Sequence, residues 1–363
     1  MNRSPNVGAA ASRMRVLVVD DDPVYRKIVG LALEAVPNVQ VVGFAPTLDI
    51  ARRHITQGHV DAVTLDVVMR DECGLELLRW IRESHLRLVT ILLTAGRSSE
   101  ACRAVDALLL GASAIVMKPT GTNPQRALES ALARELASVG VRSNLQQLPA
   151  AARNSPAPKS ELAAPREVIA IGASTGGPPV ILSFLRDLPA SFAVPLVITQ
   201  HMPKTHLPYF VALLAEQSGR RVAPAHHGTV LARGCAYVAT GDGHLGLRRH
   251  DNDIVIVLDH GPEEHHCKPA VDPMFRSVAR CCGAASVGVL MTGMGSDGAL
   301  GAVALRESGA PVVVQDKETS VVWGMPGAAV AHGAADSVLP ADRLAQCVVA
   351  WTSGLHTGPR TPL

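Results

Sequence analysis

Short apolar runs alternate with amphipathic stretches of helical length over the first 135 residues of the chain. Within the runs nearly every side chain is apolar, which is typical of strands buried on both faces of a parallel sheet. We expect five such strands: Val16–Val19, Val39–Val42, Ala62–Leu65, Val89–Leu93 and Ala114–Met117. Because helices separate them, the pattern predicts an α/β domain with a doubly wound parallel sheet over residues 14–135.

The second half repeats this alternation with different motifs. Its expected strands are Val168–Ile171, Pro195–Thr199, Val287–Met291 and Pro311–Val314. Between them, from about Gly234 to Leu258, alternating polar and apolar residues with Gly-Asp-Gly turns predict hairpins or a small β insertion. Residues 168–350 are therefore expected to form a second doubly wound α/β domain, Rossmann-like in arrangement.

The segment between the two halves, residues 136–167, differs in composition from both. It is rich in Ala, Pro, Ser and Asn and has few large apolar side chains. Such a segment cannot bury enough surface to offset its ordering entropy, so a linker is expected. The alternative that its first few residues continue the preceding helix stays open. Two domains and a tether fit a length of 363 residues.

Net charge, apolar runs and cysteine number indicate which binding partners and which cellular compartment to expect. The formal net charge of +2 comes from 34 basic and 32 acidic residues, which indicates neither nucleic-acid binding nor an anionic membrane partner. No apolar run approaches the roughly 20 residues of a membrane span, and residues 1–14 have no signal-peptide pattern. We therefore expect no membrane insertion. Seven cysteines without a CxxC pair favour reduced thiols in a cytoplasmic protein.

Polar residues directly follow four of the first five strands. Asp20 and Asp21 follow the first strand, Asp66 the third, Thr94 the fourth and Lys118 the fifth. Ligands of open α/β sheets bind at this carboxyl edge, and crowded carboxylates require a cation such as Mg²⁺. Asp66 is then the expected nucleophile towards a phosphoryl donor, with Lys118 and Thr94 contacting phosphoryl oxygens. The alternative that these acids cap the following helices remains open.

The motifs VLVVDDDP, AVTLDVVM, LLTA and VMKP resemble those of response-regulator receiver domains, which have a flavodoxin-like (βα)₅ fold. The resemblance implies that Asp20, Asp21 and Asp66 bind Mg²⁺ and that Asp66 is the phosphoacceptor. It also implies that Thr94 and Lys118 sense the phosphoryl group.

Three positions depart from the receiver pattern. Arg70 stands where a proline is usual, Cys73 replaces the usual aspartate before Gly74, and Ile115 occupies the aromatic switch position. The residues that carry the chemistry are intact. Because the three departures affect the conformational relay, we expect a weaker response to phosphorylation than is usual in the family.

The second domain places three other chemical types after its strands. Ser174 follows the strand that begins at Val168, His201 follows the next, and Asp297 follows the strand beginning at Val287. A serine activated by an imidazole, itself oriented by a carboxylate, is the constellation for acyl transfer. The surrounding G-x-S-x-G pattern is typical of a nucleophile elbow, and the following helix N-terminus is expected to supply N–H groups to an oxyanion.

Dinucleotide binding is the alternative for this glycine-rich turn. Two observations count against it. The spacing is G-x-S-x-x-G, not G-x-G-x-x-G. Where a ribose-binding acid is expected, the chain has Gln200 and His201.

Other histidines lie in polar, turn-rich stretches. His226, His227, His265 and His266, with Cys267, have no acidic or cysteine partner at standard zinc spacing. We interpret them as surface residues or as lining of a substrate groove.

Six motifs of the second half, in order, resemble the catalytic domain of chemotaxis protein-glutamate methylesterases: IAIGASTGGP, VITQHMP, GDGHLGL, KPAVDPMF, VGVLMTGMGSDGA and VVWGMP. The resemblance implies that Ser174 is the nucleophile, His201 the base and Asp297 the orienting acid. It assigns oxyanion stabilisation to Thr175 and to the backbone N–H of Met294.

This resemblance implies a phosphorylation-regulated hydrolase of glutamate γ-methyl esters, with glutamine deamidation as a second activity. The expected partners are the methylated cytoplasmic domain of a chemoreceptor and a sensor histidine kinase, and the esterase domain is expected to need no cofactor. The resemblance also implies that the unphosphorylated receiver restrains the esterase. Two alternatives stay open: a binding module without catalysis, and a hydrolase acting on another ester in a non-chemotaxis chemosensory pathway.

Overall fold

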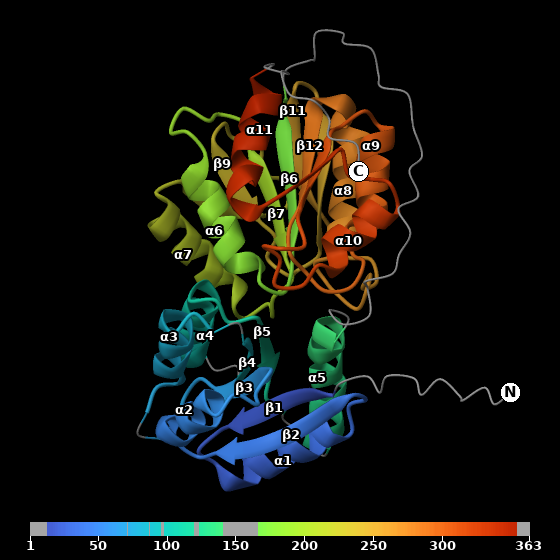
Figure 1. The fold of residues 1–363 in the computed structure, drawn as a ribbon. Helices are drawn as coiled ribbons and strands as arrows, with labels where there is room; N and C mark the ends of the chain where they lie inside the picture. Colours follow the sequence, from blue (N-terminus) through green and yellow to red (C-terminus); the bar gives the residue numbers. More distant parts are fainter. Residues whose placement is uncertain are drawn as a thin grey trace, which may run out of the picture. The chain divides into compact units, whose positions relative to one another are not determined.

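The computed structural model describes residues 13–353 except 71, 87, 96–97, 120–122 and 141–165. These residues form two compact units, each built around one main sheet (Figure 1). Most of the expected linker, 136–167, lies outside the described residues. Its first residues continue helix α5 (Pro124–Gly140), as the alternative interpretation allowed.

The first unit contains a five-stranded sheet in the order β2-β1-β3-β4-β5. Its strands are β1 (Met14–Val19), β2 (Val39–Ala45), β3 (Ala62–Asp66), β4 (Val89–Thr94) and β5 (Ala114–Met117). Strand β1 pairs in parallel with β2 and β3, and β3 with β4. All five expected strands are present, and each of the polar residues singled out above ends or follows one of them.

Helices alternate with these strands along the chain: α1 (Pro23–Glu34), α2 (Leu48–Thr56), α3 (Gly74–Glu83), α4 (Ser98–Leu109) and α5. Helix α1 packs against α5, and α2 against α3. The edge strand β2 differs from expectation, because Phe44 is 46% exposed and the strand is only partly buried. An edge strand has a neighbour on one side only, so its side chains receive less cover.

The second unit contains a seven-stranded sheet in the order β14-β13-β12-β6-β7-β9-β8, and every neighbouring pair is parallel. Its strands are β6 (Val168–Ala173), β7 (Leu196–Gln200), β8 (Arg221–Pro224), β9 (Cys235–Val238), β12 (Ser286–Leu290), β13 (Val312–Gln315) and β14 (Ser337–Leu339). The four expected strands are β6, β7, β12 and β13.

The polar stretch expected to form a β insertion divides between two sheets. Strands β10 (His244–His250) and β11 (Asp253–Asp259) pair as an antiparallel hairpin, as predicted. Strand β9 instead joins the main sheet between β7 and β8. Its four residues, Cys235–Val238, are all buried, because β9 has a neighbouring strand on each side.

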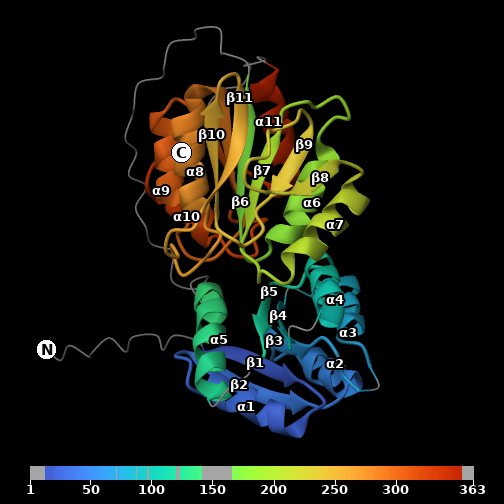
Figure 2. The ribbon, with the colours of Figure 1, turned by 180° about the vertical axis from the view of Figure 1, so that it is seen from behind.

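Helices cover both faces of the second sheet (Figures 1 and 2). They are α6 (Gly177–Asp187), α7 (Leu207–Ser218), α8 (Val271–Cys282), α9 (Ala299–Glu307), α10 (Gly324–Ala331) and α11 (Leu344–Thr352). Alternate residues of β6 point to opposite faces: Ala170 packs in the core beside α8 and α9, whereas Ile169 packs beside α6, α7 and α11. The second unit therefore has two apolar layers with one sheet between them.

Among the described residues, no helix is both long enough and apolar enough to cross a membrane.

Candidate active site

Ser174 lies in a sharp turn between β6 and α6. The backbone N–H of Ser174 donates to the carbonyl of Thr292 at 3.0 Å, which ties the turn to the end of β12. The Ser174 carbonyl accepts from the N–H of Gly177 at 2.8 Å and from the side-chain amide of Gln200 at 2.9 Å. The backbone of the serine is thus fixed from three elements.

Two glycines make this turn possible. Gly176 has a φ of +76°, a conformation that L side chains rarely adopt. A Cβ at Gly293, after β12, would lie 2.9 Å from the Cβ of Ser174. Larger residues at either position would displace the serine turn, so the glycines explain how Ser174 reaches the carboxyl edge of the sheet.

His201 and Asp297 meet at the same edge. The Nε2 atom of His201 lies 2.7 Å from Oδ2 of Asp297, whose side chain is 1% exposed. The Asp297 carboxylate also accepts three backbone N–H groups, from Val271 at 2.6 Å, Asp272 at 2.8 Å and Gly298 at 2.9 Å. Four donors therefore hold one buried carboxylate in a single orientation.

These contacts shift both ionisations. Burial opposes the charged form of Asp297, but the hydrogen bond from His201 and those from Val271 and Asp272 outweigh it and lower the pKa of the carboxyl. Burial also opposes the charged His201, yet Asp297 and the neighbouring Cys267 thiol outweigh it and raise the His201 pKa to about 10. The aspartate is thus ionised and favours the imidazolium.

The serine and the histidine lie at the ends of neighbouring strands. The N–H of His201 donates to the carbonyl of Ala173, the residue before Ser174, at 3.0 Å. In the described part of the chain, no hydrogen bond joins the Ser174 hydroxyl to the His201 ring. Such bonds are often long in a free enzyme and shorten in the complex with substrate.

The two expected oxyanion donors, the N–H of Met294 and Thr175, have different surroundings. Met294 follows Gly293, whose carbonyl accepts the N–H groups of Gly324 and Met325 at 3.0 and 2.9 Å. Among the contacts of the described residues, the Met294 N–H has no acceptor. Thr175 is buried, and its carbonyl accepts from the Thr292 hydroxyl at 3.0 Å.

The N-terminus of α6 offers fewer donors than predicted. Pro178 and Pro179 occupy the first turn and have no N–H. The N–H of Gly177 is already bonded to Ser174. We therefore correct the expectation that this helix end supplies several free N–H groups.

The structure brings three further polar side chains to the site. Cys267 interacts with the His201 ring, and the Nε2 atom of His265 lies 2.8 Å from Oδ2 of Asp272. The sequence interpretation left His265 and Cys267 as surface or groove residues and gave Asp272 no role. The signal that could have found them is their position, within and just before the KPAVDPMF motif.

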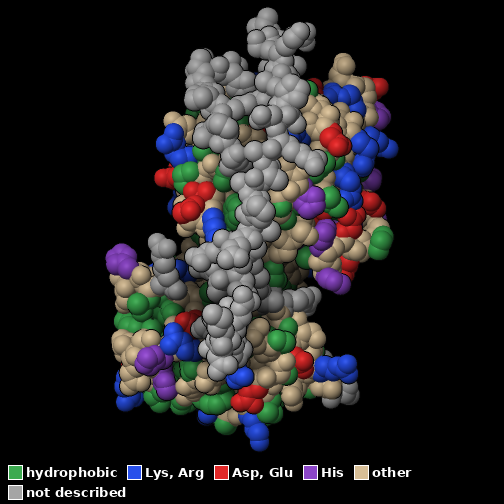
Figure 3. Space-filling model, turned by 45° about the vertical axis from the view of Figure 1, so that its right-hand side comes forward, with side chains coloured by type: hydrophobic (Ala, Val, Ile, Leu, Met, Phe, Trp, Pro, Cys, Tyr) green, Lys and Arg blue, Asp and Glu red, His purple; other side chains and the backbone are tan. Residues whose placement is uncertain are grey.

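The remaining histidines agree with the surface interpretation. His226, His227 and His266 are exposed, and Figure 3 shows histidine side chains on the surface of the second unit among acidic and basic ones. His206, which that interpretation did not include, is fully buried at the start of α7, and burial lowers its pKa to about 4.

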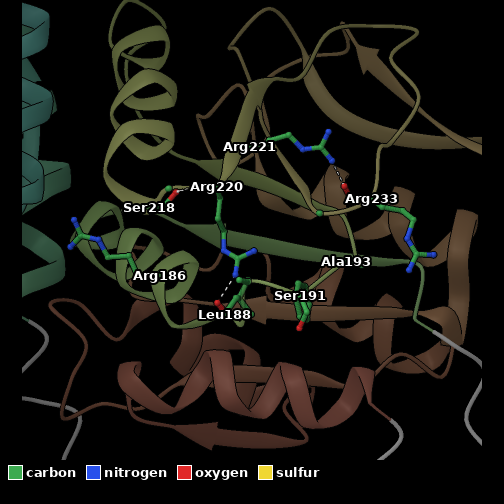
Figure 4. A pocket seen from close by; sticks show the side chains of 12 residues that line it. Arg186, Leu188, Ser191, Ala193, Ser218, Arg220, Arg221 and Arg233 are labelled. Atoms are coloured by element: carbon green, nitrogen blue, oxygen red, sulfur yellow. Dashed lines mark hydrogen bonds between the residues drawn. The ribbon is translucent and has the colours of Figure 1, made fainter.

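A cavity of about 560 Å³ lies at the opposite edge of the second sheet, near the first residues of β7, β8 and β9 (Figure 4). Arginines line much of it, but their guanidinium groups bond to backbone carbonyls: Arg220 to Leu185 and Pro189, and Arg221 to Arg233. We interpret these arginines as ties between helix ends and turns. Ser174 does not line this cavity.

The acidic residues of the first unit converge as predicted. Lys118 Nζ lies 2.9 Å from Oδ2 of Asp20 and 2.7 Å from Oδ2 of Asp66. Burial raises the pKa of Asp66 even though Lys118 opposes the shift. Thr94 is buried at the end of β4.

Helix α1 is capped by Asp22, not by Asp20 or Asp21. The side chain of Asp22 accepts the N–H of Val24 at 2.8 Å and caps α1. Asp20 accepts the N–H of Asp22 at 2.9 Å, and Asp21 accepts the N–H of Arg70 at 3.1 Å. The capping alternative is therefore wrong for Asp20 and Asp21.

This cluster fits a divalent cation. Carboxylate oxygens of Asp20, Asp21 and Asp66 lie within 4.8 Å of one another, and hard oxygen donors suit Mg²⁺ or Ca²⁺. Among the described residues, Lys118 is the only positively charged side chain that contacts both Asp20 and Asp66.

Each of the two units matches a known protein family. Residues 16–131 match the response regulator receiver domain family, and residues 169–348 match the CheB methylesterase family. A protein-glutamate methylesterase/protein-glutamine glutaminase of Trichodesmium erythraeum is 37% identical, over 93% of this chain and 98% of its own length. One from Anaeromyxobacter dehalogenans is 38% identical, over 95% and 97%.

A solved structure agrees as well. The CheB methylesterase catalytic domain of Thermotoga maritima has a TM-score of 0.50 and 35% identity, and the match covers 51% of this chain and 97% of that one. Fold and comparisons thus define a receiver domain joined to a methylesterase domain of α/β architecture. The chain belongs to the family of protein-glutamate methylesterases with an N-terminal receiver domain.

Proposed function

We propose that this enzyme hydrolyses γ-methyl esters of glutamate on the cytoplasmic domain of a chemoreceptor, with Ser174, His201 and Asp297 as its catalytic triad. The observation that carries the proposal is the 2.7 Å contact between His201 and Asp297, at the sheet edge where the strand before Ser174 also ends. The same residues support deamidation of receptor glutamines, since both reactions pass through a tetrahedral oxyanion.

The proposed reaction has two stages. His201 takes the proton of the Ser174 hydroxyl as its oxygen attacks the ester carbonyl, and Asp297 stabilises the imidazolium. The N–H of Met294, together with Thr175, stabilises the oxyanion. The imidazolium then gives its proton to the departing methoxide, which leaves as methanol. Water, activated by the neutral His201, releases glutamate from the acyl-enzyme.

We further propose that Asp66 accepts a phosphoryl group from a sensor histidine kinase. Asp20, Asp21 and Asp66 would hold Mg²⁺, which neutralises charge on the carboxylates and the phosphoryl group. Lys118 then pairs with a phosphoryl oxygen and Thr94 bonds to another. We assign the receiver to residues 14–135, the linker to 136–167 and the catalytic domain to 168–350, in a protein that works in the cytoplasm.

The test is release of methanol from a methyl-labelled receptor fragment by the purified full-length protein, with and without phosphodonor. A serine-directed covalent probe accompanies it. Methanol release together with labelling of Ser174 supports the proposal. Labelling without methanol release indicates another ester substrate, and absence of both indicates a binding module.

A further inference from the structure

A second buried carboxylate lies beside the proposed triad. Asp272, on the first turn of α8, has no exposed surface. Its Oδ1 accepts the N–H of Gly301 at 2.6 Å, and its Oδ2 lies 2.8 Å from Nε2 of His265. An isolated buried charge is costly, so the partners of Asp272 are what allow it to remain there.

Asp272 and Asp297 are close enough to influence each other. The N–H of Asp272 donates to Oδ1 of Asp297 at 2.8 Å. Burial, and then the charge of Asp297, raise the pKa of Asp272, while Gly301 and His265 oppose the rise. Two adjacent carboxylates repel each other, so hydrogen-bond donors to each of them stabilise the arrangement.

His265 is the side chain that reaches both carboxylates. Its Nε2 atom lies 3.9 Å from Oδ1 of Asp297 as well as 2.8 Å from Asp272. The imidazole is 34% exposed, so the protein covers most of the ring. The other charged pair near this turn, Glu264 with Arg276 at 2.6 Å, is satisfied within itself.

The backbone that carries His265 is strained. A tight turn joins Glu264 and Cys267 through two backbone hydrogen bonds. Its central residues, His265 and His266, have φ of +52° and +59°, where glycine or asparagine is usual. Strain of this kind persists where the surrounding structure requires a particular side-chain direction, and here the turn directs His265 towards Asp272.

A metal ion is the competing interpretation, because His265, Asp272 and Asp297 have donor atoms within 4.8 Å of one another. The Asp297 carboxylate, however, already accepts hydrogen bonds from His201 and three backbone N–H groups. A cation would have to displace some of these donors. The geometry therefore favours a network of hydrogen bonds.

Resting on the proposed function, we infer that His265 and Asp272 form a second imidazole–carboxylate pair whose role is to position Asp297. Neither residue needs to touch the substrate. Asp272 orders the backbone N–H groups that hold Asp297, and the contact with His265 holds the Asp272 carboxylate in place. The pair thereby sets how strongly Asp297 stabilises the imidazolium of His201.

The test uses variants of both residues in the full-length protein. Asp272→Asn removes a negative charge beside Asp297, so the His201 pKa should fall and the pH midpoint of kcat/KM should move downward by on the order of one unit. His265→Ala removes the contact with Asp272 and should lower kcat with little change in KM. His265→Gln, whose side-chain amide can still donate to Asp272, should restore kcat. His266→Gln, in the same turn, is the control and should change nothing.

The His201 pKa is also read directly by NMR titration of the ring in each variant. This readout needs no turnover, so it separates the inference from the proposed function: loss of methanol release would overturn the latter alone. An unchanged His201 pKa in Asp272→Asn, together with full kcat in His265→Ala, would show that the pair only joins α8 to α9. Failure of His265→Gln to restore the kcat lost in His265→Ala would equally overturn the inference.

Discussion

The Nε2 atom of His201 lies 2.7 Å from Oδ2 of Asp297, although 96 residues separate them along the chain. His201 follows β7 and Asp297 follows β12, and β6 lies between these two strands in the sheet. Ser174 follows β6, so the three proposed triad residues come from three adjacent strands. The carboxyl edge of a parallel sheet is where such loops converge.

Replacing the proposed nucleophile tests this arrangement most directly. Ser174→Ala should lower the rate of methanol release on the order of 10⁴-fold or more, because no hydroxyl remains to form the acyl-enzyme. Ser183→Ala, on the exposed side of α6, is the control and should retain full activity. Activity of the Ser174 variant within tenfold of wild type would exclude it as nucleophile.

The activity should increase with pH. Only the neutral His201 ring accepts the serine proton, and its pKa is raised to about 10, so the midpoint of kcat/KM should lie above the ordinary histidine value of about 6.5. Asp297→Asn should move the midpoint downward and lower kcat, because it removes the charge that favours the imidazolium. A wild-type midpoint at or below 6.5 would contradict this assignment. The Ser174→Ala protein supplies the correction for spontaneous ester hydrolysis.

Phosphorylation of the receiver should depend on one carboxylate and on a divalent cation. A small-molecule phosphodonor with Mg²⁺ should add one phosphoryl group, and Asp66→Asn should add none; intact-protein mass spectrometry measures both. Asp49→Asn, on an exposed position of α2, is the control. Persistent labelling of the Asp66 variant, or labelling that ignores chelator, would show that the acidic cluster has another role.

Removal of residues 1 to about 140 should raise basal esterase activity, and phosphorylation of the full-length protein should raise it too. One modification can supply a regulatory change of about 5–150-fold, and Arg70, Cys73 and Ile115 lead us to expect the low end. The solved catalytic domain from Thermotoga maritima, 35% identical, indicates that this part folds alone. Equal rates for the full-length protein, its phosphorylated form and the truncated protein would show that the receiver does not gate the esterase.

Loss of a large buried side chain should lower the stability of the second unit. Phe210, on α7, is fully buried, so Phe210→Ala should reduce the free energy of unfolding by about 3–5 kcal/mol. Leu300→Ala is the control, since Leu300 is 54% exposed, and it should change stability little. Denaturant unfolding of both variants measures the difference, and comparable losses would contradict the assignment of Phe210 to the core.

The sequence by itself determined nine of the strands, and with them the residues that follow each strand end. This succeeds because strand burial is a local pattern and because all carboxyl ends of a parallel sheet meet at one edge. Asp20, Asp66 and Lys118 could therefore be predicted to meet without coordinates, as could His201 and Asp297.

The tertiary structure alone decided the pairing of Asp272 with His265 and the entry of β9 into the main sheet. Neither follows from a strand end. The first depends on how α8 packs beside α9 and on a turn in which two histidines adopt positive φ. The second depends on which neighbours bury Cys235–Val238. Contacts of this kind depend on side-chain packing between separate elements, and local periodicity carries no information about them.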